Sequence, residues 1–176
     1  MQATIDITAA LAGCEFEGRG TSGLAAAAKA AAEADFVVLM LGLHAGRPGE
    51  AAEGEDWDRE HLLFSYAEEA LLKAVAAVAK SPITLVIMSG GTIDASWAFD
   101  SPKVGAVLQS WYPGQAGGEA IARILTGEEA PSGRLPVTIY SNEVFLARRP
   151  AITEMSMTAG GGVTAGYDTI PAVRPL

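Results

Sequence analysis

The sequence has 176 residues, of which 49% are hydrophobic, so it is long enough and apolar enough to form one domain with a buried core. Its 21 acidic and 12 basic residues give a net charge of -9. A surface of that sign repels phosphate backbones and anionic lipids, so neither a nucleic acid nor a membrane is an expected partner. The single cysteine, Cys14, excludes an intrachain disulfide and is interpreted as a small apolar residue.

Helix and strand patterns alternate along the sequence from about residue 23. Residues 23–34 predict a helix, because alanine has the highest helix propensity and Thr21–Ser22 can cap its start. The apolar run FVVLMLGL then predicts a buried strand at about 36–42. This run is far shorter than the roughly 20 residues that cross a bilayer, and the N-terminal MQATIDITAA lacks the pattern of an export signal.

The middle of the chain repeats the same alternation. Ser65 and Glu68 have the spacing of a capping box, and apolar residues at three- and four-residue intervals predict a helix that runs to Lys80. Residues 83–88, ITLVIM, predict a second buried strand. Gly90–Gly91 then form either a tight turn or a backbone cradle for an anion or a sugar hydroxyl.

The last elements follow in the same order. A short helix is expected to open at Ile93, where Asp94 would complement its dipole. Residues 104–108 predict a third buried strand, and a helix after WYPG is expected to end at Gly127. Periodicity is lost after residue 140, and residues 158–176 predict an extended or disordered arm behind a domain of residues 1–157.

This alternation predicts an α/β fold: a mostly parallel sheet with helices on both faces, a flavodoxin-like three-layer sandwich. Ligands of such sheets bind beyond the carboxyl ends of the strands, where the loops after Leu43, Met88 and Ser110 would meet. His44 begins the first of these loops and is either a ligand contact or a solvated histidine. His44 and His61 lack the spacing of a helical metal pair, so no zinc site and no cofactor are expected.

The same loop carries residues 50–60, EAAEGEDWDRE, with six carboxylates and a tryptophan. A solvated charged loop is one interpretation, and a calcium site is a second, although the order of residues is not that of an EF-hand loop. The third is catalysis, because neighbouring negative charges raise the pKa of a carboxylic acid toward the range that a general acid needs. Trp57 favours sugar chemistry, since an indole packs on the C–H face of a sugar ring.

Four stretches taken together resemble a known family. In order and spacing, ADFVVLMLGL, EGEDWDRE, ITLVIMSGGTIDASWA and the segment from VGAVLQSWYPGQAGG to APSGRLPVTIY are similar to the C-terminal α/β sandwich domain of glycoside hydrolase family 3. The β-xylosidases and related β-glucosidases of that family are most similar, and the resemblance runs from about residue 13 to 157. The glycine and proline motifs YPGQAGG and APSGRLPVT are its most specific parts.

The resemblance implies a retaining exo-acting β-glycosidase, a β-xylosidase in preference to a β-glucosidase. Its nucleophile would lie on a separate barrel domain, and a glutamate of the acidic loop would be the general acid/base. Glu55 is the first candidate for that glutamate and Glu53 the reserve, with Arg59 holding the loop. Trp57 and His44 are the candidate substrate-binding residues, and the substrate would be a β-linked or xylo-oligosaccharide.

The resemblance also implies parts that this sequence does not contain: a barrel, in cis or in trans, and an additional strand ahead of residues 11–23. Uncovered sheet edges would then favour self-association. A full-length enzyme of this kind would be secreted or periplasmic, although this chain carries no signal. The alternative is a non-catalytic carbohydrate-binding or interaction module that kept the fold.

Overall fold

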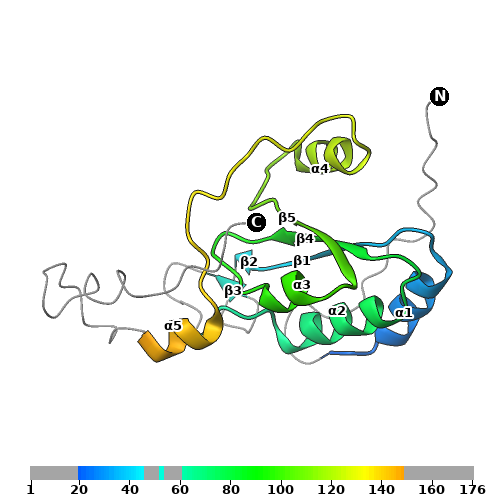
Figure 1. Cartoon of the computed structure of the whole chain (residues 1–176), viewed down its shortest axis with the longest axis horizontal. Coiled ribbons are helices and arrows are strands. Elements are labelled where there is room, and N and C mark those ends of the chain that lie inside the picture. The colour runs from blue at the N-terminus through cyan, green and yellow to red at the C-terminus, as the bar shows by residue number, and fades with distance from the viewer. Residues whose placement is uncertain (1–19, 46–51, 54–60, 149–176) are drawn as a thin grey trace, which may run out of the picture.

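The computed structural model describes residues 20–45, 52–53 and 61–148. Within these ranges three parallel strands form a sheet with helices on its two sides (Figure 1). The elements in chain order are α1 (Leu24–Glu33), β1 (Val38–Gly42), β2 (His44–Ala45), β3 (Ala52–Glu53), α2 (Tyr66–Val78), β4 (Ile83–Met88), α3 (Ser96–Asp100), β5 (Val104–Gln109), α4 (Gly117–Leu125) and α5 (Asn142–Arg148).

The sheet has the strand order β1-β4-β5, with β4 in the centre and parallel pairing on both of its sides. The central position explains the sequence of β4, because a strand buried on both faces reads as an unbroken apolar run. Ile83, Leu85 and Val86 are fully buried. The predicted α/β fold with a parallel sheet is confirmed.

The main core lies between the sheet and the layer formed by α1, α2 and α3, below the sheet in Figure 1. Helix α2 supplies the largest share, because its apolar stripe of Leu71, Leu72 and Val75 faces the strands. Val78, at the end of the predicted stripe, is instead 42% exposed. None of the helices in the described part of the chain is long and apolar enough to span a bilayer.

A register shift in β5 keeps its side chains in this core. The pairing steps from Ile83↔Val104 to Thr84↔Ala106, so Gly105 has no partner of its own. As a result Val104 and Val107, three residues apart, both pack against the main core. Glycine suits this position because an added Cβ would lie 3.1 Å from the Cβ of Pro82.

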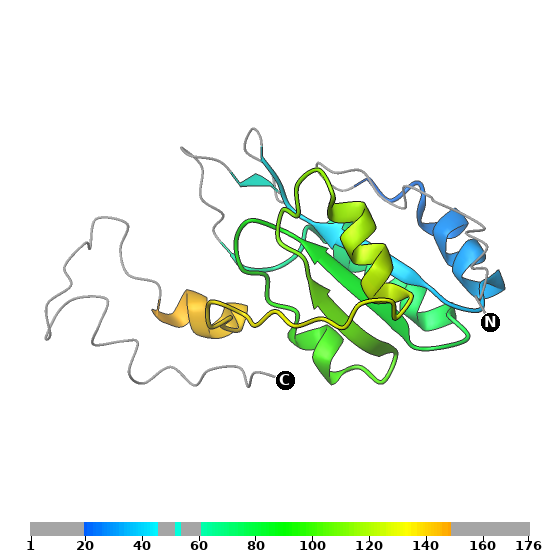
Figure 2. The same ribbon diagram turned by 90° about the horizontal axis from the view of Figure 1, so that it is seen from above.

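The opposite face of the sheet carries a thinner layer. Helix α4 lies over the strands in the view from above (Figure 2), and Ile121 is its buried apolar side chain. Gly127 ends the helix region with φ 75°, as predicted. Farther along the same face, Val38 and Met40 of β1 remain 46% and 49% exposed, so the prediction of a strand buried on both faces is wrong for the first part of β1.

Three local predictions were wrong. The N-cap of α1 is Gly23, without a side-chain cap from Thr21–Ser22. The short helix begins at Ser96 and not at Ile93, and the Asp94 side chain, outside the helix, accepts a hydrogen bond from the Ser96 N–H at its start. The chain after residue 140 is not irregular throughout, since α5 follows. The predicted arm of residues 158–176 lies outside the described residues.

Close contact between β1 and β4 requires glycine at position 42. Gly42 pairs with Met88 at the carboxyl edge, where an added Cβ would lie 1.7 Å from the Met88 carbonyl oxygen. We therefore expect Gly42→Ala to lower the free energy of unfolding by about 3 kcal/mol or more. Gly118→Ala in α4 is the matched control, since no atom lies within 4 Å of its added Cβ.

For Gly118→Ala we expect no loss and a gain of about 0.5–1 kcal/mol, because alanine is the better helix former. Urea unfolding followed by far-ultraviolet circular dichroism measures both. Equal stability of the two variants would contradict the tight β1–β4 contact.

Candidate functional site

The carboxyl ends of β1, β4 and β5 meet at one edge of the sheet, next to β2 and β3 in Figure 1. Backbone hydrogen bonds extend the strand pairing into the loops. The Leu43 N–H donates to the Met88 carbonyl at 2.8 Å, and the Ser110 N–H donates to the Ile87 carbonyl at 2.9 Å. The loops after Leu43, Met88 and Ser110 thus begin side by side, as the sequence predicts.

The strand pair β2–β3 brings Ala52 and Glu53, which belong to the acidic segment of residues 50–60, back to this edge. His44 pairs with Ala52, and Ala45 pairs with Glu53, in parallel register. The backbones of His44 and Glu53, two of the predicted site residues, therefore belong to one small sheet directly beyond β1. Glu55 and Trp57 lie outside the described residues, so their roles remain predictions.

Glu68 holds both ends of the segment that contains β2 and β3. Its Oε2 accepts hydrogen bonds from the Ser65 N–H at 3.1 Å and from the Ser65 hydroxyl at 2.8 Å, which completes the predicted capping box of α2. Its Oε1 accepts a third hydrogen bond, at 2.8 Å, from the N–H of Gly42 at the end of β1. The side chain is buried, so water does not compete strongly for these bonds.

The third loop of the edge contacts the first. The Tyr112 hydroxyl donates a hydrogen bond to the Leu43 carbonyl at 3.2 Å, although the two residues are 69 positions apart. Leu43 is therefore held through its N–H by β4 and through its carbonyl by the loop after β5. The loop that leads from β1 to the acidic residues 50–60 is therefore fixed at its start from two sides.

A second junction holds the chain just after the acidic residues 50–60. The Leu62 carbonyl accepts from the Asp94 N–H at 2.7 Å, and the Leu62 N–H donates to the Asn142 side-chain oxygen at 2.8 Å. Asp94 closes the triangle, because its Oδ2 accepts from the Asn142 N–H at 2.7 Å. Asp94 thus joins α5 to the edge, although it lies before α3 and not in the first turn of a helix as predicted.

The glycine turn after β4 borders a hollow on the surface. Buried Ser89 donates to the Gly91 carbonyl at 2.8 Å and accepts from the Gln109 side chain at 3.1 Å, which ties the turn to β5. Trp111 adopts φ 55°, an unusual backbone conformation for a residue with a side chain. The hollow has a volume of about 470 Å³ and is lined by Gly90, Gly91, Thr92, Trp111, Pro136 and Val137.

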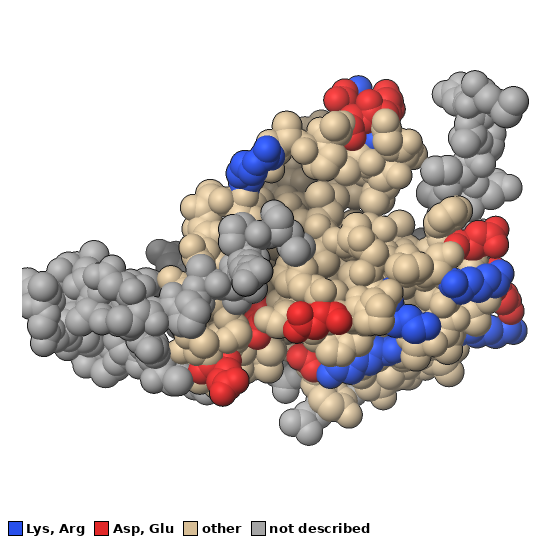
Figure 3. Space-filling model, viewed as in Figure 1, with Lys and Arg blue, Asp and Glu red and all other residues tan. Residues whose placement is uncertain are grey.

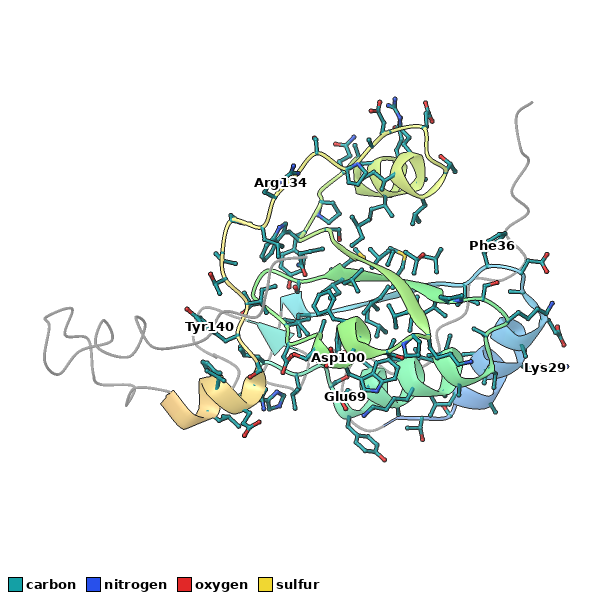
Figure 4. The ribbon with its side chains drawn as sticks, in the orientation of Figure 1. Lys29, Phe36, Glu69, Asp100, Arg134 and Tyr140 are labelled. Atoms are coloured by element: carbon teal, nitrogen blue, oxygen red, sulfur yellow. The ribbon has the colours of Figure 1, made fainter. Side chains whose placement is uncertain are left out.

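Many charged side chains of the described residues gather along the α1–α2 side and around α4, and the surface beneath α4 is hollowed (Figure 3). Lys29 and Glu69 come from the helices on the far side of the main core, whereas Arg134 and Tyr140 come from the long connection between α4 and α5 (Figure 4). In the described part of the chain, no group of three His, Cys, Asp or Glu side chains is placed to hold a metal ion.

The positioning residues of this edge were largely missed by the sequence analysis. Glu68 was recognised for its local cap and not for its bond to Gly42. Asn142 lies where the sequence predicts irregular chain, and Tyr112 belongs to the motif YPGQAGG, whose spacing does not indicate a bond to Leu43. The signals lie in long-range hydrogen bonds, which residue spacing does not show.

Most of the sequence matches a family model. Residues 2–166 match the Glycosyl hydrolase family 3 C-terminal domain, so the chain belongs to this family. Beta-D-xylosidase 1 of Arabidopsis thaliana is 42% identical over 161 residues, which are 90% of this chain and 20% of that protein. Beta-xylosidase/alpha-L-arabinofuranosidase 2 of Medicago sativa subsp. varia is 41% identical over 150 residues, 85% of this chain and 18% of that protein.

Solved structures show the same relationship. A family 3 exo-β-xylosidase in complex with a xylobiose aziridine activity-based probe superposes with a TM-score of 0.71 at 32% identity, over 85% of this chain and 19% of that one. The β-D-glucoside glucohydrolase of Trichoderma reesei gives a TM-score of 0.59 at 28% identity, over 80% of this chain and 19% of that one. The chain thus spans about one fifth of the length of these relatives.

Proposed function

We propose that this domain supplies the general acid/base of a retaining exo-acting β-glycosidase, a β-xylosidase in preference to a β-glucosidase. The observation that carries the proposal is the β2–β3 pair, since it brings the backbone of Ala52 and Glu53, within the acidic residues 50–60, to the carboxyl edge of the sheet. Ligands of parallel sheets bind at that edge. The family membership and the two plant relatives named for β-xylosidase activity support the substrate class.

The chemistry requires two carboxylates about 5–5.5 Å apart on either side of the sugar. In the proposed enzyme a nucleophile on a barrel domain attacks the anomeric carbon and forms a glycosyl-enzyme, while Glu55 donates its proton to the departing glycosidic oxygen. Glu55 then removes a proton from the water that attacks the same carbon, which releases the sugar and restores the nucleophile. Glu53 is the reserve for this role.

The neighbouring residues would bind the sugar. Trp57 would stack on the ring of an outer sugar unit, and His44, at the start of β2, would hydrogen-bond a hydroxyl. Residues 1–157 would form the domain, with 158–176 as an extended arm. The barrel would be joined in cis or bound in trans, so the isolated chain is expected to be nearly inactive.

A chimaera tests the acid/base assignment. We would replace the aligned segment of the Arabidopsis relative with this chain and measure hydrolysis of xylobiose. Glu55→Gln is expected to lower kcat by about 10²- to 10⁴-fold, because an amide neither donates nor accepts the transferred proton. The activity of Glu50→Gln, which makes the same change of charge in the same segment, is expected to stay within about twofold of the parent.

Glu53→Gln decides which of the two glutamates is the acid/base. A large loss in Glu53→Gln with full activity in Glu55→Gln would move the role to Glu53. Full activity in both variants would refute the proposal. Turnover of an aryl β-xyloside by the isolated 176-residue chain, abolished in Glu55→Gln, would contradict the need for a barrel.

A second candidate function rests on the hollow beside the glycine turn. Trp111 and the backbone of Gly90–Gly91 line a space of about 470 Å³, large enough for a single sugar unit. An aromatic side chain beside such a hollow can pack on the C–H face of a sugar ring. The domain alone would then bind xylose or xylobiose without catalysis.

Calorimetric titration of xylobiose into the isolated chain separates the two functions. The catalytic proposal expects no binding up to about 10 mM, because most of the sugar pocket would lie on the barrel. Binding in the millimolar range or tighter that is lost in Trp111→Ala and kept in Trp97→Ala would favour the binding module. Trp97 is the matched control since it is 41% exposed on α3 and does not line the hollow.

A further inference from the structure

Glu68 makes more contacts than a helix cap needs. A capping box uses one glutamate oxygen to accept the N–H of the cap residue, and the Oε2 of Glu68 does so for Ser65 at 3.1 Å. The Oε1 atom points away from this local motif and accepts the Gly42 N–H at 2.8 Å, across 26 positions of sequence. One carboxylate therefore joins the end of β1 to the start of α2.

The chain between these two anchors is the part that leaves and rejoins the sheet edge. Gly42 is the last residue of β1, and Ser65 is the N-cap of α2, so residues 43–64 begin and end on the same side chain. This segment includes β2 and β3. Because both anchors belong to packed elements, the carboxylate sets the separation between the two points where the segment is attached.

The bonds are of a kind that fixes positions well. A carboxylate that accepts hydrogen bonds from two N–H groups and one O–H group makes charge-assisted bonds, which are stronger than neutral ones. Glu68 is only 5% exposed, so loss of the carboxylate would leave the Gly42 and Ser65 donors buried without an acceptor. Gly42 also has no room for a side chain toward β4, because an added Cβ would lie 1.7 Å from the Met88 carbonyl oxygen.

We infer that Glu68 is a positioning residue for the acid/base: it sets the attachment of the segment that carries the catalytic glutamate, without contacting the substrate. This inference rests on the proposed function of that segment. Glu68 acts through the backbone at both anchors, so its removal displaces the acid/base while the core of the domain stays folded. Glu69, the next residue, makes instead an exposed ion pair with Lys73 and serves as the control.

Amide hydrogen exchange of the full 176-residue chain, measured by NMR, tests the anchoring without any need for activity. Glutamine at position 68 retains one acceptor oxygen, and Ser65 offers that oxygen two donors against the single donor of Gly42, so in Glu68→Gln the amide nitrogen faces the Gly42 N–H. We expect the Gly42 N–H to exchange at least tenfold faster in Glu68→Gln, with amides in the middle of β4 unchanged within twofold. Glu69→Gln is expected to change neither.

Ser65→Ala distinguishes anchoring from capping. It removes the hydroxyl that accepts from the Glu68 N–H but leaves the bond between Glu68 and Gly42. We expect faster exchange in the first turn of α2 and no change at Gly42. Unchanged exchange at Gly42 in Glu68→Gln, or an equal increase in Ser65→Ala, would overturn the inference and leave the acid/base assignment intact.

The effect of Glu68→Gln on catalysis is measured in the active chimaera with two substrates. Xylobiose needs a proton on its leaving group, whereas 2,4-dinitrophenyl β-xyloside does not, so a displaced acid slows the first far more. We expect Glu68→Gln to lower kcat for xylobiose about tenfold or more. The rate constant for formation of the glycosyl-enzyme from the dinitrophenyl substrate should fall by less than about twofold. Glu69→Gln should leave both rates unchanged.

Equal losses on both substrates would indicate general damage to the fold and would overturn the positioning role. Failure of the proposed function has a different signature. In that case Glu68→Gln still accelerates exchange at Gly42, but Glu55→Gln and Glu53→Gln both keep the xylobiose activity of the chimaera.

Discussion

Parallel pairing of β1, β4 and β5 is the constraint on which the rest of the structure depends. It brings three carboxyl ends to one edge, and the tight contact of Gly42 with the Met88 backbone sets how closely the first two ends approach. The loops after these strands then start within hydrogen-bonding reach of one another, as the bond from Tyr112 to Leu43 shows. The candidate site is a product of this register and not of any single motif.

Two polar junctions, one buried and one partly buried, convert that edge into a support for the chain that carries residues 50–60. Glu68 binds the last residue of β1 and the N-cap of α2, while Leu62, Asp94 and Asn142 form a closed set of hydrogen bonds beside them. Buried polar groups of this kind stabilise a fold only when all partners are present. Their arrangement at the two attachment points of one segment suits a residue that must be held accurately in a site shared with another domain.

The sequence determined the central elements because their signals are local. ITLVIM predicted β4 residue for residue, since a doubly buried strand must be apolar throughout, and the Ser65–Glu68 spacing predicted the start of α2. Helix α5 was missed because seven residues carry too few turns to show a period. The bond from Glu68 to Gly42 depends on how two elements pack, and nothing in the spacing of the residues encodes it. The assignment of Glu55, by contrast, rests on the resemblance of the acidic segment to family 3 sequences and stays a prediction.

The central claim is that a glutamate of residues 50–60 is the acid/base of a retaining glycosidase, and azide trapping in the active chimaera tests it most directly. Azide needs no general base, so it attacks a glycosyl-enzyme that has lost its acid/base and gives a β-configured xylosyl azide. We expect Glu55→Ala, with 2,4-dinitrophenyl β-xyloside and azide, to form β-xylosyl azide at a rate well above its rate of hydrolysis. Formation of xylose alone by both Glu55→Ala and Glu53→Ala, at the rate of the unsubstituted chimaera, would contradict the claim.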